Sequence, residues 1–162
     1  DKKFYGFLAP RAGEIKSPGR EFLNEAVRIS VKIKENVVGR DFREGGLRKI
    51  LNLGHTFAHA LETSSGYRNI SHGEAVGSGM IDAVELSSYL GLCGQDAAAK
   101  ALSLIESAGF RRIKIDGKTL LKLIMSDKKV IDRNPVFVLL KGPGEALVKE
   151  LPVKALKKWL KH

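Results

Sequence analysis

The sequence has little cysteine, few aromatic residues and no long apolar run. Its single cysteine, Cys93, excludes an internal disulfide and is typical of a protein from a reducing compartment. The apolar runs fall far short of the roughly 20 residues that span a bilayer, and no segment has the architecture of a signal peptide. There is no internal repeat and no low-complexity tract. These absences favour a cytoplasmic protein that does not insert into a membrane.

Apolar residues and positive charge are both abundant. The 162 residues are 43% hydrophobic and 28% charged, which is the balance of one globular domain with a sizeable core. The net charge of +10 suits a nucleic acid, an acidic membrane surface or a phosphorylated small substrate. Lysine and arginine are spread along the chain, apart from a cluster in KALKKWLKH, and no aromatic-plus-basic RNA-binding pattern occurs. A solvated basic surface is the expectation, and a basic helical nucleic-acid-binding module is the alternative from a different class.

Helical periodicity runs through most of the chain. Ser17 and Pro18 form a good N-cap and first turn, and the apolar spacing that follows predicts a helix over 18–39. Further helices are expected over 47–65, 95–108, 117–126 and the last ten residues. β-Branched runs around a Gly-Pro-Gly turn predict a β-hairpin over 136–150. The small residues of HGEAVGSGM, from His72, would let the backbone of another element approach closely. The fold class is therefore mainly α with a small antiparallel hairpin.

The stretch RKILNLGHTFAHALE, residues 48–62, carries a polar stripe. Arg48, Asn52, His55 and His59 follow one another at intervals of four, three and four residues. On one helix they would fall within about a 60° arc, while the rest of the circumference is apolar and should be buried. A cationic, donor-rich line on a buried helix implies a pocket that receives an anion. The alternative is an internal salt bridge from Arg48 to Glu44 or Glu74.

Three of the four histidines lie within 18 residues, at positions 55, 59 and 72. A histidine pair at i and i+4 on a helix can bind one zinc ion, and a histidine from the next segment can complete the site. The zinc-protease pattern HExxH fails, because Thr56 stands where its glutamate would be. The residues alone leave two interpretations, a metal site or core histidines satisfied by hydrogen bonds.

Three strings, DFREGGLRKILNLGHTFAHALE, ISHGEAVGSGM and SDKKV, closely resemble the C-terminal domain of the 3-dehydroquinate synthase family. The resemblance implies the helical C-terminal domain of the dehydroquinate synthase-like fold, as a single metal- and substrate-binding domain over residues 1–162. It also implies a carbon–oxygen lyase of the shikimate pathway. Such an enzyme converts a seven-carbon keto sugar-acid phosphate (DAHP) to 3-dehydroquinate with phosphate elimination, using NAD and a divalent metal, zinc or cobalt. Other sugar-phosphate cyclases and metal-dependent polyol dehydrogenases are the alternatives within this relationship.

The resemblance assigns roles to individual residues. His55 and His72 match metal ligands, so His59 matches a catalytic group that contacts phosphate and transfers a proton, where spacing alone would pair His55 with His59. Glu44 matches a catalytic proton acceptor. The matched substrate contacts are Lys34, Arg48 for carboxylate, Asn52 for phosphate, and one lysine of SDKKV, with Lys129 favoured over Lys128.

The resemblance also implies partners outside these 162 residues. The third metal ligand of the family is a glutamate that precedes the position of Asp1, and no Gly-rich dinucleotide fingerprint occurs here. NAD would then be bound mainly by an N-terminal domain of the same enzyme, which is absent from this chain. The full-length enzyme is expected to be a homodimer, and this chain alone is expected to be inactive.

Overall fold

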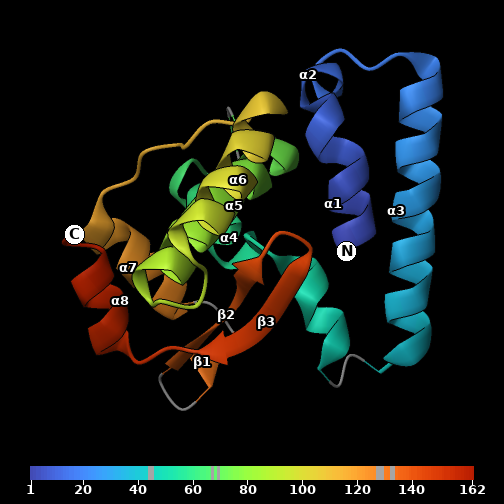
Figure 1. The fold of residues 1–162 in the computed structure, drawn as a ribbon. Helices are drawn as coiled ribbons and strands as arrows, with labels where there is room; N and C mark the ends of the chain where they lie inside the picture. The colour runs from blue at the N-terminus through green and yellow to red at the C-terminus, as the bar shows by residue number, and fades with distance from the viewer. Residues whose placement is uncertain (44–45, 67, 69, 127–129, 132–133) are drawn as a thin grey trace.

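The computed structural model describes residues 1–43, 46–66, 68, 70–126, 130–131 and 134–162, and these are mainly helical (Figure 1). The helices are α1 (Lys2–Leu8), α2 (Ala12–Ile15), α3 (Arg20–Arg40), α4 (His55–Ser64), α5 (His72–Tyr89), α6 (Gln95–Ser107), α7 (Gly117–Ser126) and α8 (Val153–Trp159), with 3-10 turns η1 (Ala9–Arg11) and η2 (Leu47–Asn52). Strands β1 (Val130–Ile131), β2 (Asn134–Gly142) and β3 (Glu145–Glu150) form one antiparallel sheet in that order. The mainly α fold and the hairpin over 136–150 are confirmed, and β1 is an addition to them.

The main hydrophobic core lies between α4, α5, α7, α8 and strand β2. Phe57 on α4 is 1% exposed, and its ring lies 5.3 Å from that of Phe137 on β2 and 5.6 Å from that of Trp159 on α8. Because large aromatic side chains bury the most apolar area, these contacts fix the position of α4 against the sheet.

Helices α4 and α5 approach each other closely through glycine. A Cβ atom at Gly79 would overlap the carbonyl oxygen of Gly54 and lie 3.0 Å from the backbone nitrogen of Ala58. Gly77, on the same helix, leaves room for the ring of Phe110. The prediction that small residues after His72 admit a neighbouring backbone is therefore confirmed.

The single helix predicted over 47–65 is wrong. Residues 47–52 form the turn η2, and α4 begins only at His55. Gly54 between them has a φ of 81°, in the left-handed region, and a Cβ atom there would lie 2.6 Å from the backbone nitrogen of Met80. The chain therefore breaks where it passes α5. Burial follows the same division, since η2 has no buried residue and α4 has five.

Helix α3 lies at the edge of the molecule beside α1 (Figure 1). It begins at Arg20 after Gly19 and ends at Arg40, close to the predicted 18–39. One contact with α1 is the stacked pair of Phe7 and Phe22, with ring centroids 5.6 Å apart. None of its residues is buried. Among the described helices, none combines the length and the hydropathy that crossing a bilayer requires.

Candidate functional site

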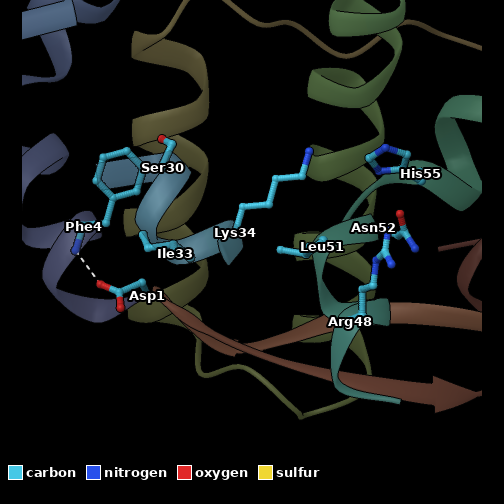
Figure 2. A pocket seen from close by; sticks show the side chains of 9 residues that line it. All are labelled: Asp1, Phe4, Ser30, Ile33, Lys34, Arg48, Leu51, Asn52 and His55. Atoms are coloured by element: carbon cyan, nitrogen blue, oxygen red, sulfur yellow. Dashed lines mark hydrogen bonds between the residues drawn. The ribbon is translucent and has the colours of Figure 1, made fainter. Parts of the chain in front are cut away.

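A cleft of about 530 Å³ opens between α1, α3, η2 and the start of α4 (Figure 2). Four of the residues predicted for the site line it together, namely Lys34, Arg48, Asn52 and His55. Figure 2 shows the Lys34 side chain extending from α3 toward the side where Arg48, Asn52 and His55 lie. Lys34 and Arg48 place positive charge on two walls of the cleft, which also includes the carboxylate of Asp1, and the two cations suit an anionic ligand.

Asp41 holds the turn that carries Arg48. Its Oδ2 atom accepts hydrogen bonds from the backbone N–H groups of Gly46, at 2.8 Å, and Arg48, at 2.9 Å. These bonds fix the start of η2 relative to the end of α3 and so set where Arg48 enters the cleft. Sequence reasoning missed this role, although aspartate is favoured where a side chain accepts from nearby backbone N–H groups.

The alternative of an internal salt bridge for Arg48 involved two carboxylates. Glu74 is engaged elsewhere, because its Oε2 atom accepts from the Ser71 hydroxyl at 2.6 Å and the Ser71 backbone at 2.9 Å. These bonds lower the pKa of Glu74, the hydroxyl contributing most. Glu44 lies outside the described residues, and so do Lys128 and Lys129. Their predicted roles stay predictions.

Two histidines from different helices lie close together, and one of them, His55, lines the cleft. His55 is the first residue of α4 and His72 the first of α5, and their ring centroids are 5.5 Å apart. His59 lies one turn after His55, with ring centroids 6.1 Å apart. With Zn–N bonds of about 2.0–2.1 Å, two imidazoles that share one tetrahedral ion have centroids roughly 5 Å apart. The ring separation of His55 and His72 therefore fits a shared ion.

The Nδ1 atoms of both rings, His55 and His72, have partners within the protein. The Nδ1 atom of His55 lies 3.3 Å from the carbonyl oxygen of Leu53, and the Nδ1 atom of His72 lies 2.8 Å from Oε1 of Glu62. Coordination of a metal by His72 would therefore use its Nε2 atom. Within the part of the chain that the structure describes, no group of three His, Cys, Asp or Glu side chains is placed to hold a metal ion.

Glu62 was not predicted as a site residue, although a signal for it exists. It lies seven residues after His55, which is two helical turns, and so it shares the face of α4 that carries His55. Its carboxylate is buried, with an exposed fraction of 9% for the residue. A carboxylate in such a position requires a hydrogen-bonding partner, and His72 provides one.

A second polar cluster joins α5 to the segment before α7, and none of its residues lines the cleft. Arg112 pairs with Asp82, at 2.9 Å between Nε and Oδ1, and with Glu85. Burial raises the pKa of Asp82 to about 6, although the charge of Arg112 acts in the opposite direction. The cluster fastens the segment before α7 to α5, as does the bond from the Ile113 backbone to the Ser78 hydroxyl.

Residues 1–130 of the chain match the family described as 3-dehydroquinate synthase C-terminal. The 3-dehydroquinate synthase of Chlorobium luteolum is 42% identical over 163 residues, which cover 90% of this chain and 45% of that protein. That of Chlorobium chlorochromatii is 39% identical over 162 residues, covering 95% of this chain and 44% of that protein. The chain thus spans less than half the length of the curated relatives that it matches.

Solved structures share the fold at low identity. A 2-epi-5-epi-valiolone synthase from Streptomyces hygroscopicus, with NAD+ and Zn2+ bound, has a TM-score of 0.82 at 17% identity, over 99% of this chain and 46% of that chain. A 2-deoxy-scyllo-inosose synthase complexed with carbaglucose-6-phosphate, NAD+ and Co2+ has a TM-score of 0.73 at 22% identity, over 87% of this chain and 41% of that chain. This similarity establishes the fold.

Proposed function

The chain belongs to the 3-dehydroquinate synthase family, and on this premise we propose that it supplies the metal- and substrate-binding half of a 3-dehydroquinate synthase. The reaction is the NAD- and metal-dependent conversion of a seven-carbon keto sugar-acid phosphate to 3-dehydroquinate, with elimination of phosphate. The observation that carries the proposal is one cleft that gathers Lys34, Arg48 and Asn52 beside His55.

The polar side chains of the cleft bind different groups of the substrate. Arg48 binds the carboxylate, because a guanidinium offers two parallel N–H donors that match two carboxylate oxygens. Asn52 binds the phosphate and Lys34 contacts the substrate from the opposite wall. Lys129, which lies outside the described residues, is the lysine of SDKKV that we assign to the phosphate by resemblance to the family. Holding both anionic ends at fixed positions orients the carbon chain between them for reaction.

His55 and His72 would hold the divalent metal, zinc or cobalt. When bound, the metal lowers the pKa of a substrate hydroxyl, as it does for water, and so promotes its oxidation. His59, one helical turn from His55, contacts the phosphate and moves a proton during elimination. Glu44 is the second proton acceptor. A positioned acid–base group of this kind contributes about 10²- to 10⁴-fold in rate.

NAD would bind mainly to an N-terminal domain, which corresponds to the part of the relatives that this chain does not match. We further propose a homodimer of the full-length enzyme, in the cytoplasm. The 162-residue chain alone is expected to be inactive, because it has no dinucleotide fingerprint to hold the hydride acceptor near the substrate.

Phosphate release from the keto sugar-acid phosphate, with NAD and zinc, tests this division of labour. The assay compares this chain alone, the N-terminal half of a relative alone, and a mixture of the two. Turnover is expected only from the mixture, and it should be lost with His55→Ala. Turnover by this chain alone that depends on His55 would disprove the assignment of NAD binding to the other half, and a mixture without turnover counts against the proposed reaction if the halves are shown to bind each other.

The carboxylate contact distinguishes this reaction from those of the related cyclases, whose substrates need not carry that group. In the active mixture, Arg48→Lys should lower kcat/KM by about 10- to 100-fold, because a bidentate charged bond is worth about 1.5–3 kcal/mol. The matched control is Arg40→Lys, since Arg40 lies at the end of α3 and does not line this cleft. On a substrate analogue without the carboxylate, the effect of Arg48→Lys should disappear. An equal effect on both substrates would favour another cyclase.

A further inference from the structure

Glu62 is a buried carboxylate of α4 that no role proposed so far uses. Its side chain is 11% exposed, and its Oε1 atom lies 2.8 Å from Nδ1 of His72 at the start of the next helix. We propose that Glu62 is a positioning residue, which accepts the Nδ1–H of His72 and thereby turns Nε2 of that ring toward the metal. This inference rests on the metal site of the proposed function.

The direction of the proton follows from the chemistry of the two groups. An ionised carboxylate only accepts hydrogen bonds, and a neutral imidazole carries one N–H. A contact of 2.8 Å between them therefore places the proton on Nδ1 of His72 and the lone pair on Nε2. A carboxylate behind a ligating histidine also raises the basicity of the coordinating nitrogen, which strengthens the bond to a metal.

His72 needs such a partner because its own surroundings hold it weakly. The imidazole is 63% exposed at the first residue of α5, so few neighbouring atoms of the protein restrict its χ1 and χ2 angles. Glu62, by contrast, belongs to the helix that packs into the core. The close approach of Gly54 and Gly79 sets the spacing of α4 and α5, so the core of the protein determines where the exposed ligand lies.

The first test is an NMR measurement on the wild-type chain without metal. At a pH above the pKa of imidazole, ¹⁵N-detected long-range NMR spectra of the metal-free protein should show His72 with the proton on Nδ1. A ring with the proton on Nε2 would overturn the proposal, and this outcome does not depend on whether any variant folds or any metal binds.

The second test measures zinc affinity by competition with a chromogenic chelator. Glu62→Gln keeps the volume of the side chain and removes its charge, and it should weaken zinc binding by about 10- to 100-fold. The matched control is Glu85→Gln, the same change on α5 at a glutamate that pairs with Arg112 and not with a histidine. Urea unfolding of both variants separates a loss of affinity from a loss of fold. Zinc affinity within twofold of the wild type for Glu62→Gln would contradict the proposal.

A double-mutant comparison isolates the path through His72. In a His72→Ala background, Glu62→Gln should have no further effect on zinc affinity, because the ring that it orients is gone. An equal effect in both backgrounds would show that Glu62 acts in another way. If zinc affinity does not depend on His55 or His72 at all, the metal site of the proposed function fails, while the NMR result still decides the contact between Glu62 and His72.

Discussion

Helices α3 and α4 both carry side chains of the proposed site, but only α4 belongs to the hydrophobic core. Four apolar residues of α4 are buried, whereas none of the 21 residues of α3 is. The metal-ligand side of the site therefore rests on a close-packed scaffold, and Lys34 rests on a thinly packed helix. Because local opening needs less free energy where few apolar contacts must break, α3 should adapt to a ligand more readily than α4.

The exposed fractions of apolar side chains give numbers for this difference in packing between α3 and the core helices. Leu23 and Val27 are 47% and 52% exposed and follow each other at helical spacing, while Leu86 on α5, the helix packed against α4, is fully buried. The same truncation at Leu23 and at Leu86 should therefore have very different effects on stability.

Leu86→Ala should lower the free energy of unfolding by about 4 kcal/mol, because it leaves a cavity in the core. Leu23→Ala should lower it by less than about 1 kcal/mol, since the side chain is half in water already. Urea denaturation followed by circular dichroism measures both values. Similar losses at the two positions would mean that α3 is packed as firmly as α5, and the comparison would fail.

The pH dependence of stability offers a second way to compare the packed helices with α3. The pKa of Asp82 on α5 is raised to about 6 in the folded protein by burial, from 3.8. The stability that this group contributes is complete below its unfolded pKa and is lost as the pH rises through the folded pKa. The loss amounts to about 3 kcal/mol for a shift of this size. Asp82→Asn should abolish it.

The measurement is the free energy of unfolding at several values of pH between the two pKa values and above them. Exposed carboxylates with lowered pKa values act in the opposite direction, and these are Glu25, Glu74, Asp116 and Glu145. Subtracting the curve of Asp82→Asn from that of the wild type removes their contribution. Parallel curves would show that Asp82 titrates alike in the folded and unfolded chains.

Periodicity was sufficient to predict α3, α6, α7, α8 and the hairpin, but it did not predict α1, α2, α5 or the break at Gly54. A glycine inside a helix lowers helix stability by only about 1 kcal/mol relative to alanine, so a continuous apolar pattern still predicts one uninterrupted helix. The break arises from the backbone of α5, which lies against Gly54 and comes from residues 25 positions later in the chain. The stripe still brought Arg48, Asn52 and His55 together, because the turn η2 carries the first two into the same cleft.

Contacts between separate elements were beyond the sequence for the same reason. Glu62 and His72 are joined across a loop, and the raised pKa of Asp82 comes from burial that only the packed structure reveals. By contrast, the resemblance to a known family assigned His55 and His72 together, whereas helical spacing alone paired His55 with His59. The ring separation of 5.5 Å between His55 and His72 is nearer to that of two imidazoles on one ion than the 6.1 Å between His55 and His59, and the zinc affinities of His59→Ala and His72→Ala test the choice.

The smallest expected changes in the free energy of unfolding come from substitutions at two glycines, Gly79 and Gly39. One of these glycines lies where α4 and α5 meet, so its substitution also tests whether helix packing supports the metal site. Gly79→Ala should lower the free energy of unfolding by about 2 kcal/mol, because its Cβ atom would overlap backbone atoms of Gly54 that have no rotamer to change. Gly39→Ala on α3 meets no atom within 4 Å, so it should raise stability by about 0.5–1 kcal/mol by restricting the unfolded chain. Both values come from urea denaturation.

Zinc affinity of the same two variants then tests whether the spacing of α4 and α5 sets the metal site. Gly79→Ala should push α4 and α5 apart and so move Glu62 and His55 away from His72. This displacement should weaken zinc binding by about tenfold. The alanine at position 39 should leave it unchanged, since α3 carries neither histidine. If Gly79→Ala loses stability but keeps its zinc affinity, the histidines are held by their own loops, and the packed pair of helices is a support for the fold rather than for the metal.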